Sequence, residues 1–361
     1  MRTSIKRSEF LEQAHSERAE ITNVKLLASY NWLEAPLPCA PLWLESDAKR
    51  PALHNINFHS YGPDVVPPYP KCPAEPLFRA LKICSPCLDI NTVDLVTDRV
   101  NIKRLFLLIR GKELGFMIQG ELVGKTAILH RVDPYERHGP ELDKNNGFGK
   151  PFDKPITFPM IDNDKGHQRI VGYQFAGISM IVRSEIDAYV DSAGVLEAFV
   201  NKQVVDRNPP PDEECFTNPT TSLTVRHVGW GHQLETAVEI KTRDDHEPVD
   251  FNAIGPQMWI SQTYKLVRAR RDRASPVYER PCVQDISELL KDFEDDNQEV
   301  LQQLAGILHH ILSRLRGSAS GRVTVRWCRI TQQILVTSGD EPATPSFPAD
   351  MLKDWGSFDT Y

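Results

Sequence analysis

Two short stretches of this sequence combine acidic side chains with the apolar, β-branched residues that favour strands. They read IVRSEIDAYV and AVEIKTR. Because side chains two positions apart lie on one face of a strand, Glu185 and Asp187 are expected to point the same way, as are Glu239 and Lys241. If the two strands are neighbours, three carboxylates and one ammonium meet at one place.

Such a cluster predicts a divalent metal site. Carboxylates at short range repel each other, and some stay protonated at neutral pH unless a cation joins them. Oxygen-rich sites suit Mg²⁺ or Mn²⁺. The predicted metal ligands are Glu185, Asp187, Glu239 and the main-chain carbonyl of Ile240.

The chemistry expected of this site is hydrolysis of a phosphodiester. A bound metal lowers the pKa of its water and neutralises charge that builds up on the phosphate. Lys241 is expected to orient that water or to stabilise the leaving charge. Gln262, in the next element, is expected to position the water or a phosphate oxygen, so Lys241 and Gln262 are the predicted catalytic residues. The alternative is that each stretch forms only the solvent face of its strand, which is common for charged residues that alternate with apolar ones.

Composition limits the class of protein. The chain has 361 residues, 40% of them apolar and 25% charged, and a net charge of −7. These values are typical of a globular protein, and a nucleic-acid partner would need a local basic patch. No apolar run approaches the roughly 20 residues of a membrane span, and the N-terminus lacks a secretory signal. Seven cysteines with one CxxC pair, Cys84 and Cys87, predict reduced thiols and a nuclear or cytoplasmic location, without a zinc site.

The order of predicted elements indicates one mixed α/β domain rather than two. Residues 1–24 form a polar N-terminal segment, expected to be frayed or weakly helical, and residues 25–361 form the domain. Within it we expect a proline-rich arm over 25–78 and an insertion over 191–235.

Apolar periodicity predicts the regular elements of that domain. We expect helices over 75–83, 98–110 and 285–316, and a helix running into a strand over 255–269. Strands are expected over 114–119 and 121–130, in a hairpin around Ala176 and Gly177, and in a last hairpin near the C-terminus. The fold class is therefore α+β with a mixed sheet, and its order of elements resembles a PD-(D/E)XK nuclease core with flanking helices and insertions.

Five motifs in order resemble those of the DXO family of 5′-end RNA decapping exonucleases, which includes the fungal partner of the nuclear 5′-to-3′ exoribonuclease. They are VTDRVNIKRLF, GYQFA, SEID, VEIKT and ISQTYKLVRA. The resemblance places Arg99 in the substrate pocket, with Glu185 and Gln262 as further substrate contacts. It implies an RNA 5′ end as substrate, carrying a triphosphate, an incomplete cap or a non-canonical cap. It also implies Mg²⁺ or Mn²⁺ as cofactor and a 5′-to-3′ exoribonuclease as partner.

One motif departs from the family pattern. Where the family has the glutamate of its GYKFE motif, this chain has Ala176. On that alignment the second metal loses a ligand, and a weakened activity or a binding-only module becomes an alternative. A nuclease acting on DNA or on unmodified RNA would use the same residues and is a third interpretation.

Overall fold

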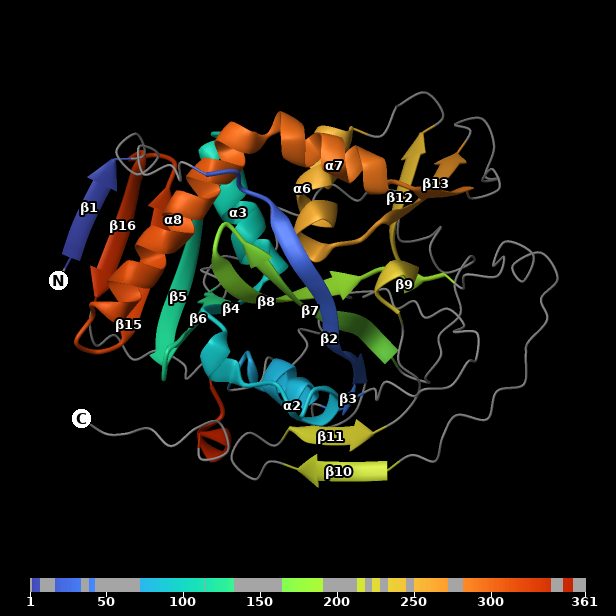
Figure 1. Ribbon diagram of the computed structural model, residues 1–361, viewed down its shortest axis with the longest axis horizontal. Coiled ribbons are helices and arrows are strands. Elements are labelled where there is room, and N and C mark those ends of the chain that lie inside the picture. Colours follow the sequence, from blue (N-terminus) through green and yellow to red (C-terminus); the bar gives the residue numbers. More distant parts are fainter. Residues whose placement is uncertain are drawn as a thin grey trace.

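The computed structural model describes residues 2–6, 17–33, 39–42, 72–113, 115–132, 164–190, 213–217, 223–227, 233–244, 250–271, 282–338 and 347–352. The strands in these ranges form two sheets (Figure 1). The large sheet has the order β1 (Arg2–Lys6), β16 (Gln333–Ser338), β15 (Arg322–Cys328), β5 (Gly115–Val123), β6 (Thr126–Arg131), β4 (Leu95–Asp98), β8 (Ile178–Ile186), β7 (Asp164–Phe175), β2 (Ile21–Leu33), β3 (Cys39–Leu42), β11 (Thr224–His227) and β10 (Glu213–Thr217). The small sheet has the order β14 (Cys282–Asp285), β13 (Lys265–Arg271), β12 (Ala237–Asp244) and β9 (Ala188–Tyr189).

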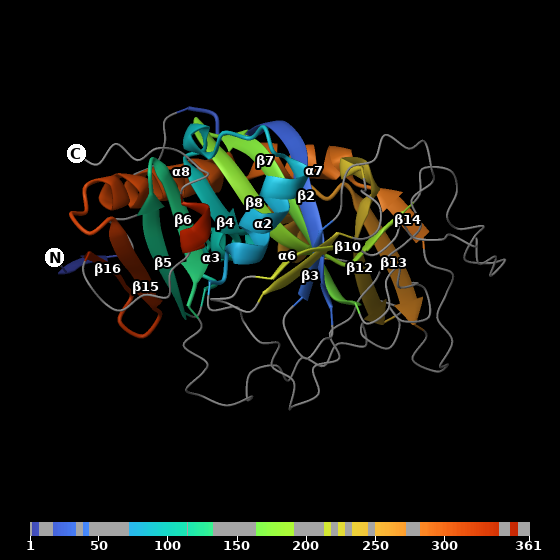
Figure 2. The same ribbon diagram turned by 90° about the horizontal axis from the view of Figure 1, so that it is seen from below.

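Helices cover both faces of the central strands (Figures 1 and 2). On one face lie α3 (Arg99–Ile109), α6 (Phe251–Ser261), α7 (Ser287–Asp296) and α8 (Gln298–Arg316), and on the other lies α2 (Glu75–Cys84). None of the helices within the described ranges is long and apolar enough to span a bilayer.

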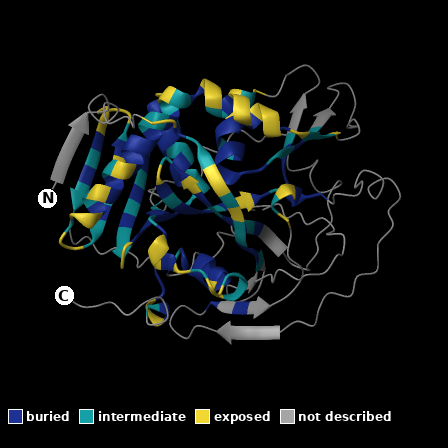
Figure 3. Ribbon diagram, in the orientation of Figure 1, coloured by how far each residue is buried: buried dark blue, intermediate teal, exposed yellow. Residues whose placement is uncertain are grey.

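Double coverage explains why the central strands read as continuous apolar runs. In β4, Leu95 packs with the helices α3 to α8 and Val96 packs with α2. In β8, Met180 and Val182 face the first cluster and Ile181 faces the second. Most residues of these two strands are buried (Figure 3). Each fully buried aliphatic side chain adds roughly 1.5–3 kcal/mol, so this double layer is the rigid base on which the polar site rests.

The structure confirms the prediction of a mixed α+β fold and most of the elements predicted from periodicity. Helices α2 and α3 lie where they were expected, and α6 is followed by strand β13. The hairpin of β7 and β8 turns at Ala176 and Gly177, and β15 and β16 form the last hairpin. The two strands expected over 114–119 and 121–130 are present as β5 and β6, but the boundary between them differs. Strand β5 extends to Val123, and the turn lies at Gly124–Lys125.

Three expectations were wrong. The N-terminal segment is not helical where it is described, because β1 pairs with β16 and β2 begins at Ile21. Strand β2 is not an arm laid over the domain but a full member of the large sheet, paired along β7. The helix expected over 285–316 is two helices separated at Asn297, whose side-chain amide donates to the Phe293 carbonyl at 2.7 Å and so ends α7. Much of the proline-rich arm and of the 191–235 insertion lies outside the described residues.

Candidate active site

Asp187 lies where the chain passes from the large sheet to the small one. Strand β8 ends at Ile186, which pairs with His167 in the large sheet. The chain then enters β9, where Ala188 pairs with Val238 of β12. The first acidic stretch is therefore divided between two sheets: its β8 part lies in the large sheet, whereas its β9 part is the expected neighbour of the second stretch in the small sheet. The crossing places Asp187 beside the strand that carries Glu239 and Lys241.

The Asp187 side chain continues the ladder between β9 and β12. The Ile240 N–H donates to Asp187 Oδ2 at 2.8 Å, two residues beyond the last backbone pair at Val238. In a strand, the N–H and C=O of one residue point to the same side. The Ile240 carbonyl therefore faces Asp187, as the metal-site prediction requires.

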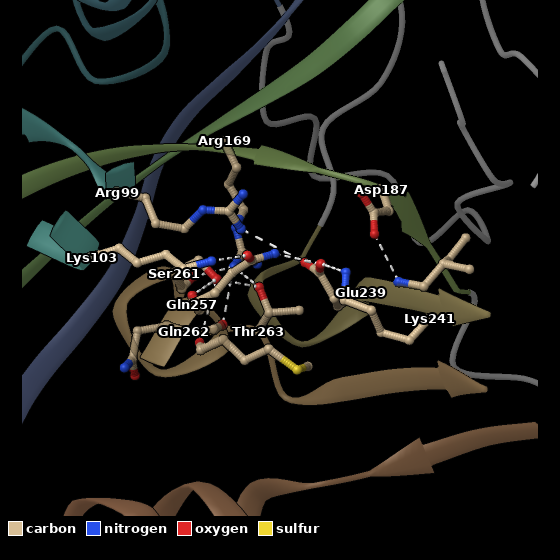
Figure 4. A network of polar contacts seen from close by, with 12 residues as sticks. Arg99, Lys103, Arg169, Asp187, Glu239, Lys241, Gln257, Ser261, Gln262 and Thr263 are labelled. Atoms are coloured by element: carbon tan, nitrogen blue, oxygen red, sulfur yellow. Dashed lines mark hydrogen bonds and ion pairs between the residues drawn. The ribbon is translucent and has the colours of Figure 1, made fainter. Parts of the chain in front are cut away.

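Glu239 is the centre of the polar network (Figure 4). It is buried, with 2% of its surface exposed. Its Oε1 accepts hydrogen bonds from Lys241 Nζ and from the side-chain amide of Gln257 on α6. Two donors on one oxygen fix the carboxylate in a single orientation.

Two further cations reach this network from the first turns of α3. Arg99 Nη1 lies 3.7 Å from Glu239 Oε2. Lys103, four residues later on the same helix face, donates to Gln257 Oε1 at 2.9 Å. Figure 4 shows both side chains approaching Glu239 from one side, with Asp187 and Lys241 on the other.

Ionisation in this cluster is uneven. Burial, and next the charge of Glu239, raise the pKa of Asp187 from 3.8 to about 7. Burial also opposes the charge on Glu239, but Lys241, Arg99 and Gln257 together hold its pKa below the ordinary value. The pKa of Lys103 is lowered by burial first and by Arg99 second. Glu239 is thus the permanent anion, whereas Asp187 needs a cation to be fully ionised near neutrality.

Glu185 does not join Asp187 and Glu239. It is exposed on β8, and because that strand ends at Ile186 the alternation expected to align it with Asp187 does not continue. Within the described ranges, no group of three or more His, Cys, Asp or Glu side chains is placed to hold a metal. The structure brings together two of the three predicted carboxylates.

Gln262 occupies a different position from the one expected. It is the residue that ends α6, in the left-handed conformation with φ +52°. Its amide donates to the Trp259 carbonyl, and its Oε1 accepts from the Tyr264 hydroxyl at 2.7 Å. Both ends of the side chain are thus engaged at the helix terminus, and Gln257, more than one turn earlier, is the glutamine that contacts Glu239.

Arg169 of β7 fixes that helix terminus to the large sheet. The side chain is completely buried. Its guanidinium donates to the carbonyls of Ser261 and Gln262, the latter at 3.0 Å, to Thr263 Oγ1 at 3.1 Å and to the Leu234 carbonyl at 2.9 Å. The carbonyl groups at the C-terminal end of α6, which carry partial negative charge, thus stabilise the Arg169 cation without a carboxylate. These hydrogen bonds hold α6, and with it Gln257, in place.

Ala176 has no part in this site. Phe175 pairs with Ile178 at one end of the β7–β8 hairpin and His167 pairs with Ile186 at the other, so Ala176 lies at the end opposite to Asp187. From Ile178 to Ile186 the nine residues of β8 span eight intervals, roughly 26 Å at about 3.3 Å per interval. Aligning GYQFA with the family glutamate motif was therefore wrong, and Ala176 gives no reason to expect a weakened activity.

Arg183 is another residue near SEID that serves the scaffold. It lies opposite Asp98 in the β4–β8 pair and forms two hydrogen bonds with that carboxylate, at 2.6 and 3.0 Å. It also donates to the Tyr30 hydroxyl at 3.1 Å. Because Asp98 immediately precedes α3, this ion pair fixes the start of the helix that carries Arg99.

Sequence reasoning missed Lys103, Gln257 and Arg169. Lys103 had a usable signal, since its spacing of four from Arg99 places both cations on one helix face. Gln257 and Arg169 had none, because their partners lie on elements far away in the sequence.

The fold is that of the Rai1 and Dxo1 structures. Rai1 from Scheffersomyces stipitis superposes with a TM-score of 0.62 at 12% identity, covering 98% of this chain and 97% of that one. Candida albicans Rai1 in complex with pU5 and Mn²⁺ has a TM-score of 0.58 at 11% identity, covering 94% and 93%. Dxo1 from K. lactis in complex with manganese has a TM-score of 0.53 at 12% identity, covering 95% and 99%. These similarities confirm the predicted resemblance to the DXO family at the level of the fold.

In sequence, residues 4–337 match a family model described as a domain of unknown function, DUF8563. The chain belongs to this family. No curated protein sequence matches the chain.

Proposed function

We propose that this protein is a metal-dependent hydrolase of RNA 5′ ends, with decapping or pyrophosphohydrolase activity and 5′-to-3′ exonuclease activity. The observation that carries the proposal is the convergence of Asp187, Glu239 and Lys241 from two sheets at the β8–β9 crossing. The convergence occurs on a fold shared with a Rai1 structure that contains pU5 and Mn²⁺.

The donor set fits one divalent ion of the Mg²⁺ or Mn²⁺ type. Among contacts of the described residues, Asp187 Oδ1 and Glu239 Oε2 accept no hydrogen bond, and the Ile240 carbonyl faces the same side. Mg²⁺ typically takes one or two protein carboxylates and completes its shell with water and substrate phosphate. When bound, the ion would supply an activated water and compensate charge on the phosphate.

The protein side chains would divide the remaining work. Lys241, held by Glu239, lies where an ammonium can orient water or stabilise a developing negative charge. Arg99 keeps its Nη1 without a hydrogen bond among the described residues, which leaves this donor for a substrate phosphate. Gln257 positions Glu239 rather than touching the reacting atoms.

The test is cleavage of 5′-labelled RNAs that carry a triphosphate, a monophosphate or a cap, in Mg²⁺ or Mn²⁺. The variants Asp187→Ala and Glu239→Gln serve as site controls, and Lys291→Met, a change of an exposed lysine on α7, serves as surface control. We expect metal-dependent loss of the 5′ group that both site variants abolish and the surface variant keeps. Unchanged cleavage by the site variants would contradict the proposal, and so would the absence of turnover on every RNA.

Two parts of the proposal rest on sequence reasoning alone, the first on the family resemblance and the second on cysteine usage. These are a 5′-to-3′ exoribonuclease as partner and a nuclear or cytoplasmic location. Co-purification of the tagged full chain with an exoribonuclease, and microscopy of the same tagged chain, would test them separately from the chemistry.

A further inference from the structure

Arg99 and Lys103 form a pair of cations that are poorly neutralised by the protein. In the described part of the chain, the nearest carboxylate of Arg99 is 3.7 Å away and its Nη1 makes no hydrogen bond. Lys103 forms no ion pair there, and its one hydrogen bond goes to the neutral amide of Gln257. Two like charges side by side in a partly buried position repel each other, and the pKa of Lys103 is lowered by burial first and by the charge of Arg99 second.

The chemistry of the partners fixes the Gln257 amide between Lys103 and Glu239. An ammonium only donates and an ionised carboxylate only accepts, so Oε1 must face Lys103 and Nε2 must face Glu239. Lys103 is therefore held beside the catalytic carboxylate without being neutralised by it. Among the described residues the other two of its three N–H groups have no acceptor and remain for a ligand.

The start of α3 adds further positive potential. Arg99 is the first residue of the helix, where main-chain N–H groups lack helical partners. Asp98, in the capping position, makes no side-chain cap hydrogen bond, because its carboxylate is engaged by Arg183. Two poorly neutralised cations and a helix terminus without a side-chain cap thus face the same site.

A terminal phosphate monoester matches this pair better than an internal phosphodiester does. The monoester carries between about 1.5 and 2 negative charges at pH 7, whereas the diester carries one. Only the former neutralises both cations and relieves their repulsion. We propose that Lys103, together with Arg99, is a specificity-determining residue that selects a 5′-terminal phosphate monoester over a 5′ hydroxyl on the nucleic-acid substrate. This inference rests on the proposed function, because the phosphate would bind beside the same carboxylates that are proposed to hold the metal.

Binding separates the role of Lys103 from catalysis. Fluorescence anisotropy would compare one labelled oligoribonucleotide with a 5′ phosphate or a 5′ hydroxyl, using the full chain without divalent ions at one fixed salt concentration. For Lys103→Met we expect about tenfold or greater loss of affinity for the 5′-phosphate form, because a charge-assisted contact is lost, and less than about threefold loss for the hydroxyl form. Lys103→Arg should restore the preference, and Lys291→Met should leave it unchanged.

Several results would overturn the inference. One is equal binding of both oligonucleotides by the wild-type chain, and another is a Lys103→Met variant that weakens both by the same factor or weakens neither. Melting temperatures check folding, and Lys103→Gln provides the same comparison if the methionine variant fails to fold. A Lys103-dependent phosphate preference without cleavage of any RNA would refute the proposed function and leave this inference standing. Cleavage by the wild-type chain without that preference would do the reverse.

Discussion

Replacing Asp187 by Asn should stabilise the folded protein at alkaline pH. The carboxyl has an ordinary pKa of 3.8 and a folded-state pKa of about 7, caused first by burial and then by the charge of Glu239. At roughly 1.36 kcal/mol for each tenfold change in proton affinity, the ionised group costs at most about 4 kcal/mol above pH 7. Asn carries no charge, and its carbonyl oxygen can still accept from the Ile240 N–H.

The sign of the pH dependence follows from proton binding. Between pH 3.8 and about 7 the folded state holds the Asp187 proton and the unfolded state does not. The contribution of this carboxyl therefore lowers stability as pH rises through that window, and the cost is constant above it. The variant lacks this contribution, so the two proteins should be equally stable near pH 4 and differ most near pH 8.

Urea unfolding at several pH values measures this difference directly. We expect the unfolding free energy of Asp187→Asn minus that of the wild type to rise from near zero at pH 4 to about 1–4 kcal/mol at pH 8. Mn²⁺ should then raise the melting temperature of the wild type more than that of the variant, since metals bind the ionised carboxylate. A difference that is flat with pH, or a variant less stable at pH 8, would refute the assignment of a buried, destabilised carboxyl.

Three further substitutions test the positions of other residues. Arg169→Met should destabilise the fold by about 3 kcal/mol or more, because several buried acceptors lose their donor, and Arg169→Lys should recover only part of this in urea unfolding. Gln257→Leu should lower kcat of RNA cleavage about tenfold or more, whereas Gln262→Ala should lower the melting temperature with kcat nearly unchanged; the opposite pattern would restore Gln262 to the catalytic site. Ala176→Glu should leave cleavage rates within about twofold of the wild type, because the residue lies roughly 26 Å from Asp187; a large gain would mean that the hairpin turn reaches the site.

Local pattern was enough to locate most of the scaffold and the chemical centre of the site. Runs of β-branched residues predicted β8 and β12, and helical periodicity predicted α2 and α3. The pairing of Asp187 with Glu239 and Lys241 followed from acidic residues in otherwise apolar strands, where a buried charge needs a functional or structural reason. The break at Asn297 was missed because the apolar stripe continues across it. The hydrogen bond from the Asn297 side chain that ends α7 leaves no mark in the pattern of apolar residues.

Other features of the site depend on contacts between residues distant in the chain. The sequence could not show that Asp187 lies between two sheets, because the end of a strand is decided by which strands are available to pair with it. It grouped Glu185 with Asp187 and Glu239, and the placement of the side chains in the described residues decided otherwise. It aligned Ala176 with a family glutamate, and the register of the β7–β8 hairpin places that residue at the opposite end from Asp187.

The sequence alone determined the residue types of the site, a strand-borne pair of carboxylates with a lysine, because alternation and composition are local properties of the chain. Only the tertiary structure decided which glutamine supports Glu239, which cations surround it and what holds α6 in place. The physical reason is that a buried polar group must find partners wherever packing brings them, and in this protein Arg169 and Ser261, which form one such contact, are 92 residues apart.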